Sequence, residues 1–150
     1  MTCTFFGHKN CSEKIEPMLR AAIVGLIENN GVNLFYVGNQ GRFDYMTYRV
    51  LKELSKTYSI EYYVVPAYLP IKKSEKYTFE PRDTLFPDGI ETVPRRYAVC
   101  YRNRWMIRRS DYVITHVSSP VGSGAAKFKD LAEKQGKTVI NIEQHIRDPR

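Results

Sequence analysis

Five short apolar segments recur along the 150-residue chain and alternate with longer segments whose apolar residues follow a helical period. The short segments are rich in β-branched and aromatic residues and are apolar almost throughout. This pattern is typical of strands buried on both faces of a parallel sheet. The predicted strands span residues 2–6, 34–37, 60–65, 112–117 and 138–142.

Helical periodicity fills the intervals between these strands. In the first interval, Ile15, Leu19, Ile23 and Leu26 form one apolar stripe, and Gly31 supplies a helix stop. Further helices are predicted over residues 43–54, from about 92 to 109, and over 125–132 before Gly136. The alternation predicts an α/β fold, namely a Rossmann-like parallel sheet of about five strands in the order 3-2-1-4-5, with helices on both faces.

The size and composition of the chain favour a single domain over residues 1–150. A chain of 17.5 kDa with 43% hydrophobic residues can bury one core. The 23 basic residues exceed the 16 acidic ones, which favours anionic partners without choosing among them. The three cysteines form no CxxC pair, and no secretory signal or membrane-spanning apolar run is visible, so we expect a cytoplasmic protein with no membrane partner.

Residues 67–92 depart from the alternating pattern. They contain Pro70, Pro81 and Pro87, several charges, and aromatic residues such as Tyr77 and Phe79. A loop of this length inside a compact domain is often a lid, a binding loop or a contact for a second subunit. An irregular surface crossover is the equally ordinary alternative.

Glycine-containing turns follow the first, second and fourth predicted strands, at one edge of the expected sheet. Glycine lets the backbone approach a ligand closely, so that amide groups can donate to an anion there, although tight turns also use glycine for geometry alone. Three such turns at the edge where open α/β sheets bind ligands indicate a phosphate-bearing ligand. The candidate residues in these turns are Gly7, His8, Lys9, Gly38, Asn39, Gln40, Gly41, Asp44, Ser118, Pro120, Gly122, Ser123, Gly124 and Ala125.

The third predicted helix adds Arg102, with Asn103 and Met106 beside it. Helical spacing places Arg102 on the same broad face as Ala98 and Trp105. An arginine on an apolar face needs an anion, because burying a lone charge is costly. That anion is either an internal carboxylate, such as Asp44 or Asp111, or the phosphate of a ligand.

Histidines and cysteines give no metal signature, so we expect neither a metal nor a cofactor. His8 follows a predicted strand and could donate to phosphate, exchange protons near neutral pH, or only cap a loop. No HxxxH or cysteine pair indicates zinc, and no GxSxG motif indicates a serine hydrolase.

The ordered combination of these motifs resembles the SLOG superfamily. The resemblance rests on the segments FFGHK (5–9), YVGNQGxFD (36–44), RNxxM (102–106) leading to SDYVI (110–114), and GxGA (122–125) followed by GKTVI (136–140). SLOG proteins include the DNA-processing Smf (DprA) type and the lonely-guy (LOG) type, and the chain is most similar to the small YpsA-like branch of bacteria and phages. The resemblance implies a nucleotide-derived ligand at the carboxyl ends of the strands.

In LOG-like phosphoribohydrolases, a PGGxGTxxE loop supplies a catalytic glutamate and an arginine of the preceding helix assists. By this resemblance Arg102 matches that arginine, whereas Phe128 stands at the glutamate position and Ala125 at the threonine position. N-glycosidic hydrolysis needs a carboxylate, so whether the chain is an enzyme stays open.

Three functions are therefore expected, in decreasing order. The first is a module that senses or sequesters a nucleotide-derived molecule without robust turnover, a role compatible with phage or bacterial defence signalling. The second is a LOG-like N-glycosidic hydrolase that uses another acid, such as Asp44 or Glu80. The third is single-stranded nucleic-acid binding by the arginines and aromatic residues of segment 95–109. Related folds and the aromatic segment also suggest a homo-oligomer.

Overall fold

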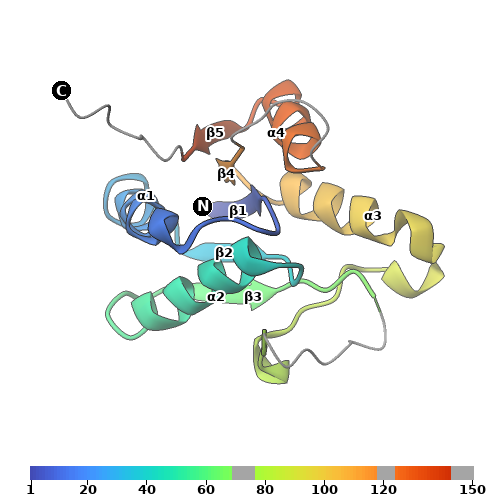
Figure 1. Cartoon of the computed structure of the whole chain (residues 1–150), viewed down its shortest axis with the longest axis horizontal. Helices are drawn as coiled ribbons and strands as arrows, with labels where there is room; N and C mark the ends of the chain where they lie inside the picture. The colour runs from blue at the N-terminus through green and yellow to red at the C-terminus, as the bar shows by residue number, and fades with distance from the viewer. Residues whose placement is uncertain (69–76, 118–123, 143–150) are drawn as a thin grey trace.

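The computed structural model describes residues 1–68, 77–117 and 124–142. Its centre is a five-stranded parallel sheet in the order β3-β2-β1-β4-β5 (Figure 1), which confirms the predicted α/β Rossmann-like fold class. The sheet reverses its winding direction at β1, where β2 lies on one side and β4 on the other. The strands are β1 (Thr2–Gly7), β2 (Leu34–Val37), β3 (Glu61–Val64), β4 (Tyr112–His116) and β5 (Thr138–Asn141).

Four α-helices connect the strands, close to the predicted ranges. Pro17 lies in the first turn of the first helix, and Gly31 ends it with a φ of 67°, a conformation that glycine adopts at little cost. Short 3₁₀ turns lie at Glu13–Ile15, Pro81–Asp83 and Ile90–Thr92. The helices are α1 (Glu16–Asn30), α2 (Arg42–Leu54), α3 (Arg95–Arg108) and α4 (Gly124–Lys134).

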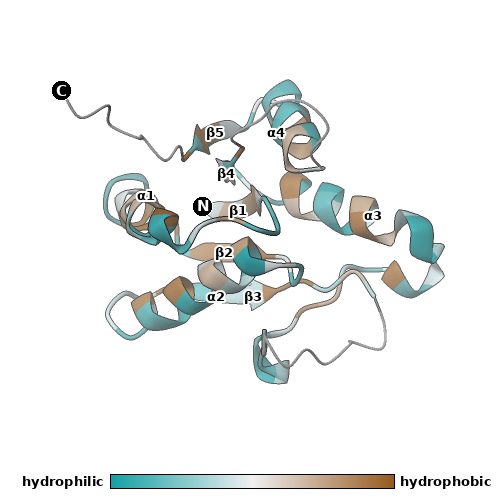
Figure 2. Cartoon of the chain, viewed as in Figure 1, coloured by the Kyte–Doolittle hydropathy of each residue, from teal (hydrophilic) through white to brown (hydrophobic). Residues whose placement is uncertain are grey.

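The sheet separates two apolar cores because successive side chains of a strand point to opposite faces. On one face, Cys3 and Phe5 of β1 pack with buried residues of α1 and α2. On the other, Phe6 packs with buried residues of α3 and α4. Figure 2 shows the largely apolar strands at the centre and hydrophilic segments recurring along the helices around them. Helices therefore cover both faces of the sheet.

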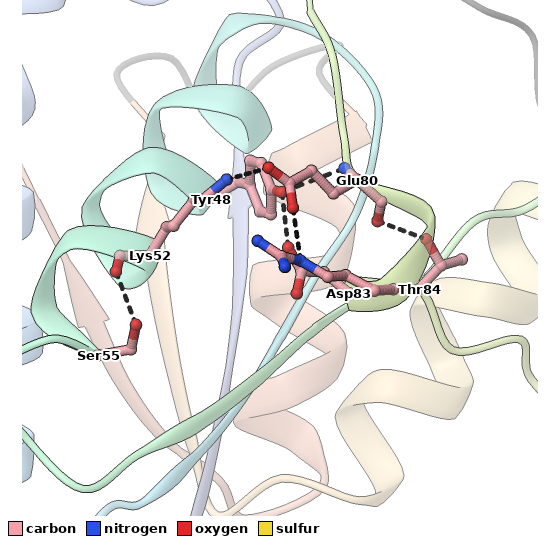
Figure 3. A network of polar contacts seen from close by, with 7 residues as sticks. Tyr48, Lys52, Ser55, Glu80, Asp83 and Thr84 are labelled. Carbon is pink, nitrogen blue, oxygen red and sulfur yellow. Dashed lines mark hydrogen bonds and ion pairs between the residues drawn. The ribbon is translucent and has the colours of Figure 1, made fainter.

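The second half of the long segment is fastened to α2. The hydroxyl of Tyr48 donates to Asp83 Oδ2 at 2.7 Å and accepts the Glu80 N–H at 3.1 Å (Figure 3). Glu80 also forms ion pairs with Lys52 and with Arg82. Beyond β3, Leu85 N–H donates to the carbonyl oxygen of Val64 at 2.9 Å and so extends the pairing at this edge of the sheet. The polar and aromatic residues of segment 77–92 thus hold it against the domain; residues 69–76 lie outside the described residues.

No helix in the described parts of the chain is long and apolar enough to cross a membrane.

Candidate functional site

A cavity of about 700 Å³ opens at the carboxyl end of the sheet, next to β1. This is the crevice in which open α/β sheets bind ligands, since the connection after β1 leads to β2 on one side and the connection after β4 leads to β5 on the other. The end of β1, the turn between β2 and α2, the inner side of α3 and the start of α4 all contribute to its wall. The lining residues are Phe5, Phe6, Gly7, His8, Lys9, Gly38, Gln40, Gly41, Asp44, Tyr68, Val99, Arg102, Asn103, Gly124, Ala125 and Phe128.

Two of the predicted turns pack directly against each other. The Arg42 N–H donates to the carbonyl oxygen of Lys9 at 2.8 Å. Gly41 has a φ of 91°, and a β-carbon at this position would lie 2.8 Å from the α-carbon of Lys9. Both the backbone angle and the close approach require glycine. The turn after β1 and the turn after β2 therefore form one continuous rim of the cavity.

Gly38 lies where two charged side chains converge. A β-carbon built on Gly38 would lie 2.7 Å from Asp44 Oδ2 and 3.0 Å from Arg102 Nη1. Asp44 comes from the first turn of α2, whereas Arg102 comes from the middle of α3. The missing side chain of Gly38 thus lets the carboxylate and the guanidinium approach the same point of the cavity wall from opposite layers.

Arg102 is buried, and its acceptors are uncharged. Nη1 donates to the carbonyl oxygen of Val65 at 2.8 Å and to Asn39 Oδ1 at 3.4 Å, and Nε donates to Asn103 Oδ1 at 2.7 Å. Burial lowers the pKa of Arg102, and the negative charge of Asp44 opposes that shift. The guanidinium is therefore positioned by neutral oxygens while its charge faces the cavity.

Of the two internal carboxylates that the sequence offered to Arg102, only Asp44 is near it. Asp111 lies at the amino end of the sheet, where its Oδ2 accepts the Thr2 N–H at 3.0 Å. Asp44 lies beside the cavity with Arg102. The nearest carboxylate is thus a wall residue of the cavity itself, and a ligand would contact both groups.

Asp44 already uses part of the second glycine turn. Its Oδ2 accepts the Gln40 N–H at 2.8 Å, so that amide donates to the protein and not to the cavity. Burial raises the pKa of Asp44 to about 6, although Arg102, the Gln40 amide and Lys9 all favour the charged form. A carboxyl group with such a pKa changes its charge close to neutral pH, which is common at functional sites.

A histidine pair lies at the end of β1 and β4. Gly7 pairs with His116 in the sheet register, and the rings of His8 and His116 meet edge to face with centroids 5.8 Å apart. Burial and the neighbouring His116 lower the pKa of His8. His116 Nδ1 lies 2.9 Å from the carbonyl oxygen of Ile142, so this nitrogen carries the proton. His8 is thus a lining residue held largely neutral at physiological pH.

The opposite side of the cavity is apolar and was missed by the sequence analysis. The rings of Phe6 and Phe128 stack with centroids 5.5 Å apart, and Val99 and Tyr68 continue this wall. Phe6 belongs to a strand-length apolar run and Phe128 to a helical apolar stripe, and both patterns indicate core. The resemblance to LOG proteins had marked only Phe128, at the position of the family's glutamate. The cavity therefore has one polar, charged side and one aromatic side.

The predicted site residues fall into three groups. Asn39 contacts Arg102 without lining the cavity, and Met106 is buried in the core, where its sulfur accepts from Thr4 Oγ1 at 3.5 Å. Ser118, Pro120, Gly122 and Ser123 lie outside the described residues. The remaining predictions are brought together as lining residues, namely Gly7, His8, Lys9, Gly38, Gln40, Gly41, Asp44, Arg102, Asn103, Gly124 and Ala125.

Within residues 1–68, 77–117 and 124–142, no group of three or more His, Cys, Asp or Glu side chains could hold a metal ion. The sequence matches no protein-family model, and no curated protein matches it significantly.

Proposed function

We propose that this protein binds a nucleotide-derived ligand in the cavity and acts as a sensing or sequestering module without robust turnover. The observation that carries the proposal is the buried Arg102, held by neutral oxygens at the wall of a cavity of about 700 Å³. A buried cation that lacks a directly hydrogen-bonded carboxylate favours an anionic ligand at that point.

The polar side of the cavity suits a phosphate or another small anion. Arg102 and Lys9 supply positive charge, and the backbone near Gly124 can approach a ligand closely because no atom lies within 4 Å of where its β-carbon would be. At Gly7 the missing side chain instead makes room for the Phe43 ring. The turn after β2 contributes less than the sequence suggested, because Asp44 takes the Gln40 amide. The anion is therefore expected between the β1 turn, Arg102 and the start of α4.

The rest of the cavity suits a ring and hydroxyl groups. The stacked Phe6 and Phe128 rings provide a flat apolar surface on which a nucleobase could stack. Asp44, which lies beside Gly38 at the cavity wall, can accept hydrogen bonds from sugar hydroxyls. An anion, a sugar and an aromatic base together define a nucleotide-derived molecule, which agrees with the resemblance to SLOG proteins.

N-glycosidic hydrolysis is the second candidate, and Asp44 is the observation that favours it. Its raised pKa of about 6 would let it exchange a proton near neutral pH. However, Asp44 is the only carboxylate among the described lining residues, whereas glycoside hydrolysis ordinarily uses two. Release of free base from AMP or ADP-ribose by the wild type, lost in Asp44→Asn, would establish this activity in place of simple binding.

Isothermal titration calorimetry against nucleoside mono- and diphosphates, ADP-ribose and cyclic ADP-ribose derivatives tests the binding proposal. We expect at least one ligand to bind with micromolar or tighter affinity and Arg102→Met to weaken it about 100-fold, equivalent to about 2.7 kcal/mol. Arg104→Met is the matched control on the same helix and should bind like the wild type. Absence of heat for every ligand, together with no nucleotide in mass spectra of the purified protein, would refute the proposal.

A further inference from the structure

Segment 95–109, which contains α3, carries almost the entire charge excess of the protein. It has six arginines and no acidic residue, whereas the rest of the chain has 17 basic and 16 acidic residues. Arg102 points inward to the cavity, but the other five arginines are exposed. Figure 2 shows the resulting hydrophilic segments along α3. The five exposed arginines, which we call the outer arginines, are Arg95, Arg96, Arg104, Arg108 and Arg109.

None of the outer arginines has a carboxylate within ion-pair distance in the part of the chain that the structure describes. Three of them lie over aromatic rings instead. The guanidinium carbon lies 4.3 Å from the ring centre of Tyr68 for Arg95 and 4.1 Å from that of Trp105 for Arg109. Arg96 lies 4.8 Å from the ring centre of Tyr97. Stacking orients the planar guanidinium groups while leaving their charge unneutralised.

The position of these charges does not serve the stability of α3. Arg95 and Arg96 occupy the first turn, where the positive end of the helix dipole repels cations, and this turn contains no acidic residue. Tyr97 in the same turn is 53% exposed, which is unusual for a large aromatic side chain. The first turn of α3 thus holds two cations that have no carboxylate partner and one exposed aromatic ring. This combination indicates a surface that contacts a partner.

Helical geometry arranges the outer face as a stripe. Tyr97, Arg104 and Arg108 are separated by seven and four residues, so they lie on one side of α3, opposite the buried side chains of Arg102 and Met106. By the same spacing, Arg95 and Arg109 lie on the side of Arg102 and outside this stripe. The stripe is about 16 Å long, from eleven residues at 1.5 Å each. Lys127 of α4 adds a cation at its side, with Nζ 4.0 Å from Cys100 Sγ.

We propose that the outer face of α3 binds the backbone of single-stranded nucleic acid, separately from the ligand in the cavity. Guanidinium groups recognise phosphates by paired hydrogen bonds, and the exposed Tyr97 ring offers a stacking surface for an unpaired base. A second copy of the chain is a poor occupant because its own outer arginines would repel this face.

Fluorescence anisotropy with a labelled 12-nucleotide oligothymidylate tests the proposal. Arg104, Arg108 and Lys127 supply about three phosphate contacts on this face, so the logarithm of the affinity should fall with a slope of about −2.1 against the logarithm of salt, roughly a 20-fold loss between 50 and 200 mM. Arg104→Glu/Arg108→Glu should weaken binding at least tenfold and reduce the slope by about 1.4. Lys14→Glu/Lys56→Glu, with the same change in net charge at two other exposed positions, should change the affinity less than threefold.

Circular dichroism melts test whether both double variants fold, and calorimetry with ADP-ribose and the nucleoside mono- and diphosphates tests whether the cavity is intact. Equal losses in the two double variants would overturn the proposal, since bulk charge would then explain the binding. Tighter binding of the matching duplex, or equally tight binding of polyglutamate, would also overturn it. Loss of oligonucleotide binding with intact cavity binding in the arginine variant supports it and separates it from the proposed function.

Discussion

Arg102 and Arg104 are two residues apart on α3, yet they occupy opposite environments. Arg102 is 3% exposed and donates to the oxygens of Val65, Asn39 and Asn103 at the cavity wall. The Arg104 side chain is exposed and forms no ion pair with another described residue. The same side chain therefore belongs to the structure of the cavity on one side of the helix and to solvent on the other.

The contrast separates arginines that stabilise the folded domain from arginines that are available for recognition. A buried guanidinium contributes to folding through each acceptor that it satisfies, so its removal should disturb both the fold and the cavity. An exposed, unpaired guanidinium contributes almost nothing to folding. Substitutions on the inner side of α3 should change both the stability of the fold and ligand binding in the cavity. Substitutions on the outer side should leave the fold unchanged.

The largest effect is expected for Arg102→Met compared with Arg104→Met. Arg102→Met leaves the oxygens of Val65 and Asn103 without their donor and Asp44 without its counter-charge, so the free energy of unfolding should fall by about 2–4 kcal/mol. Arg104→Met should stay within about 0.5 kcal/mol of the wild type. Urea denaturation monitored by circular dichroism measures both. Equal stabilities of the two variants would contradict the contrast between the inner and outer sides.

Gly38→Ala tests the convergence of charges at the cavity wall. The added β-carbon would lie 2.7 Å from Asp44 Oδ2 and 3.0 Å from Arg102 Nη1, so both side chains must move, at an expected cost of about 1–3 kcal/mol. Gly25→Ala is the control, because nothing lies within 4 Å of its β-carbon inside α1, and it should stabilise the protein by about 0.5–1 kcal/mol. Thermal or urea unfolding of both variants is the measurement. If both alanines stabilise the protein, the close approach at Gly38 is wrong.

Asp44→Asn tests whether the cavity carboxyl is present at a cost to stability. The folded-state pKa, raised to about 6, lies above the ordinary value of about 4, so the native state binds this proton more tightly than the unfolded state. The stability due to this group is therefore complete below pH 4 and decreases as pH rises from 4 to 6. At pH 7, Asp44→Asn should be more stable than the wild type by about 1–2 kcal/mol, with no difference near pH 4. Urea denaturation of both proteins at pH 4 and pH 7 measures these differences. If the variant is less stable than the wild type at pH 7, Asp44 has a structural role.

Arg96→Gln should have the smallest effect. Its loss removes the contact with the Tyr97 ring but also relieves repulsion at the start of α3, so the two changes largely offset. The melting temperature measured by differential scanning calorimetry should change by less than about 2 °C, corresponding to about 0.5 kcal/mol. A larger loss would show that the outer side of α3 contributes to folding and would weaken the contrast with Arg102.

The arrangement of the sheet could be predicted from the sequence because its causes are local. Strand-length apolar runs separated by helical periods leave few ways to bury both, and right-handed crossovers between parallel strands leave few strand orders, of which 3-2-1-4-5 is a common one. The three glycine turns follow from the same order, since the carboxyl ends of parallel strands lie at one edge. Two of these turns and the start of α4 accordingly meet at the cavity.

The partners of the cavity side chains could not be predicted, because they depend on contacts between segments far apart in the chain. The sequence left Asp44, Asp111 or a ligand as the anion for Arg102, and only the packing of α3 over β2 places Asp44 nearby and Asp111 at the other end of the sheet. Likewise, the Tyr48 hydroxyl forms hydrogen bonds with Asp83 and Glu80 only because segment 77–92 folds back onto α2.

The α/β fold, the edge at which the glycine turns gather, and the requirement of Arg102 for an anion follow from the residues alone, since periodicity, chirality and the cost of burying charge act on any chain with this pattern. The aromatic wall of Phe6 and Phe128, the hydrogen bond from the Gln40 N–H to Asp44, and the neutral acceptors of Arg102 arise only when the layers pack. These features depend on distances of a few ångströms between separate layers, and such distances are fixed only when the layers pack.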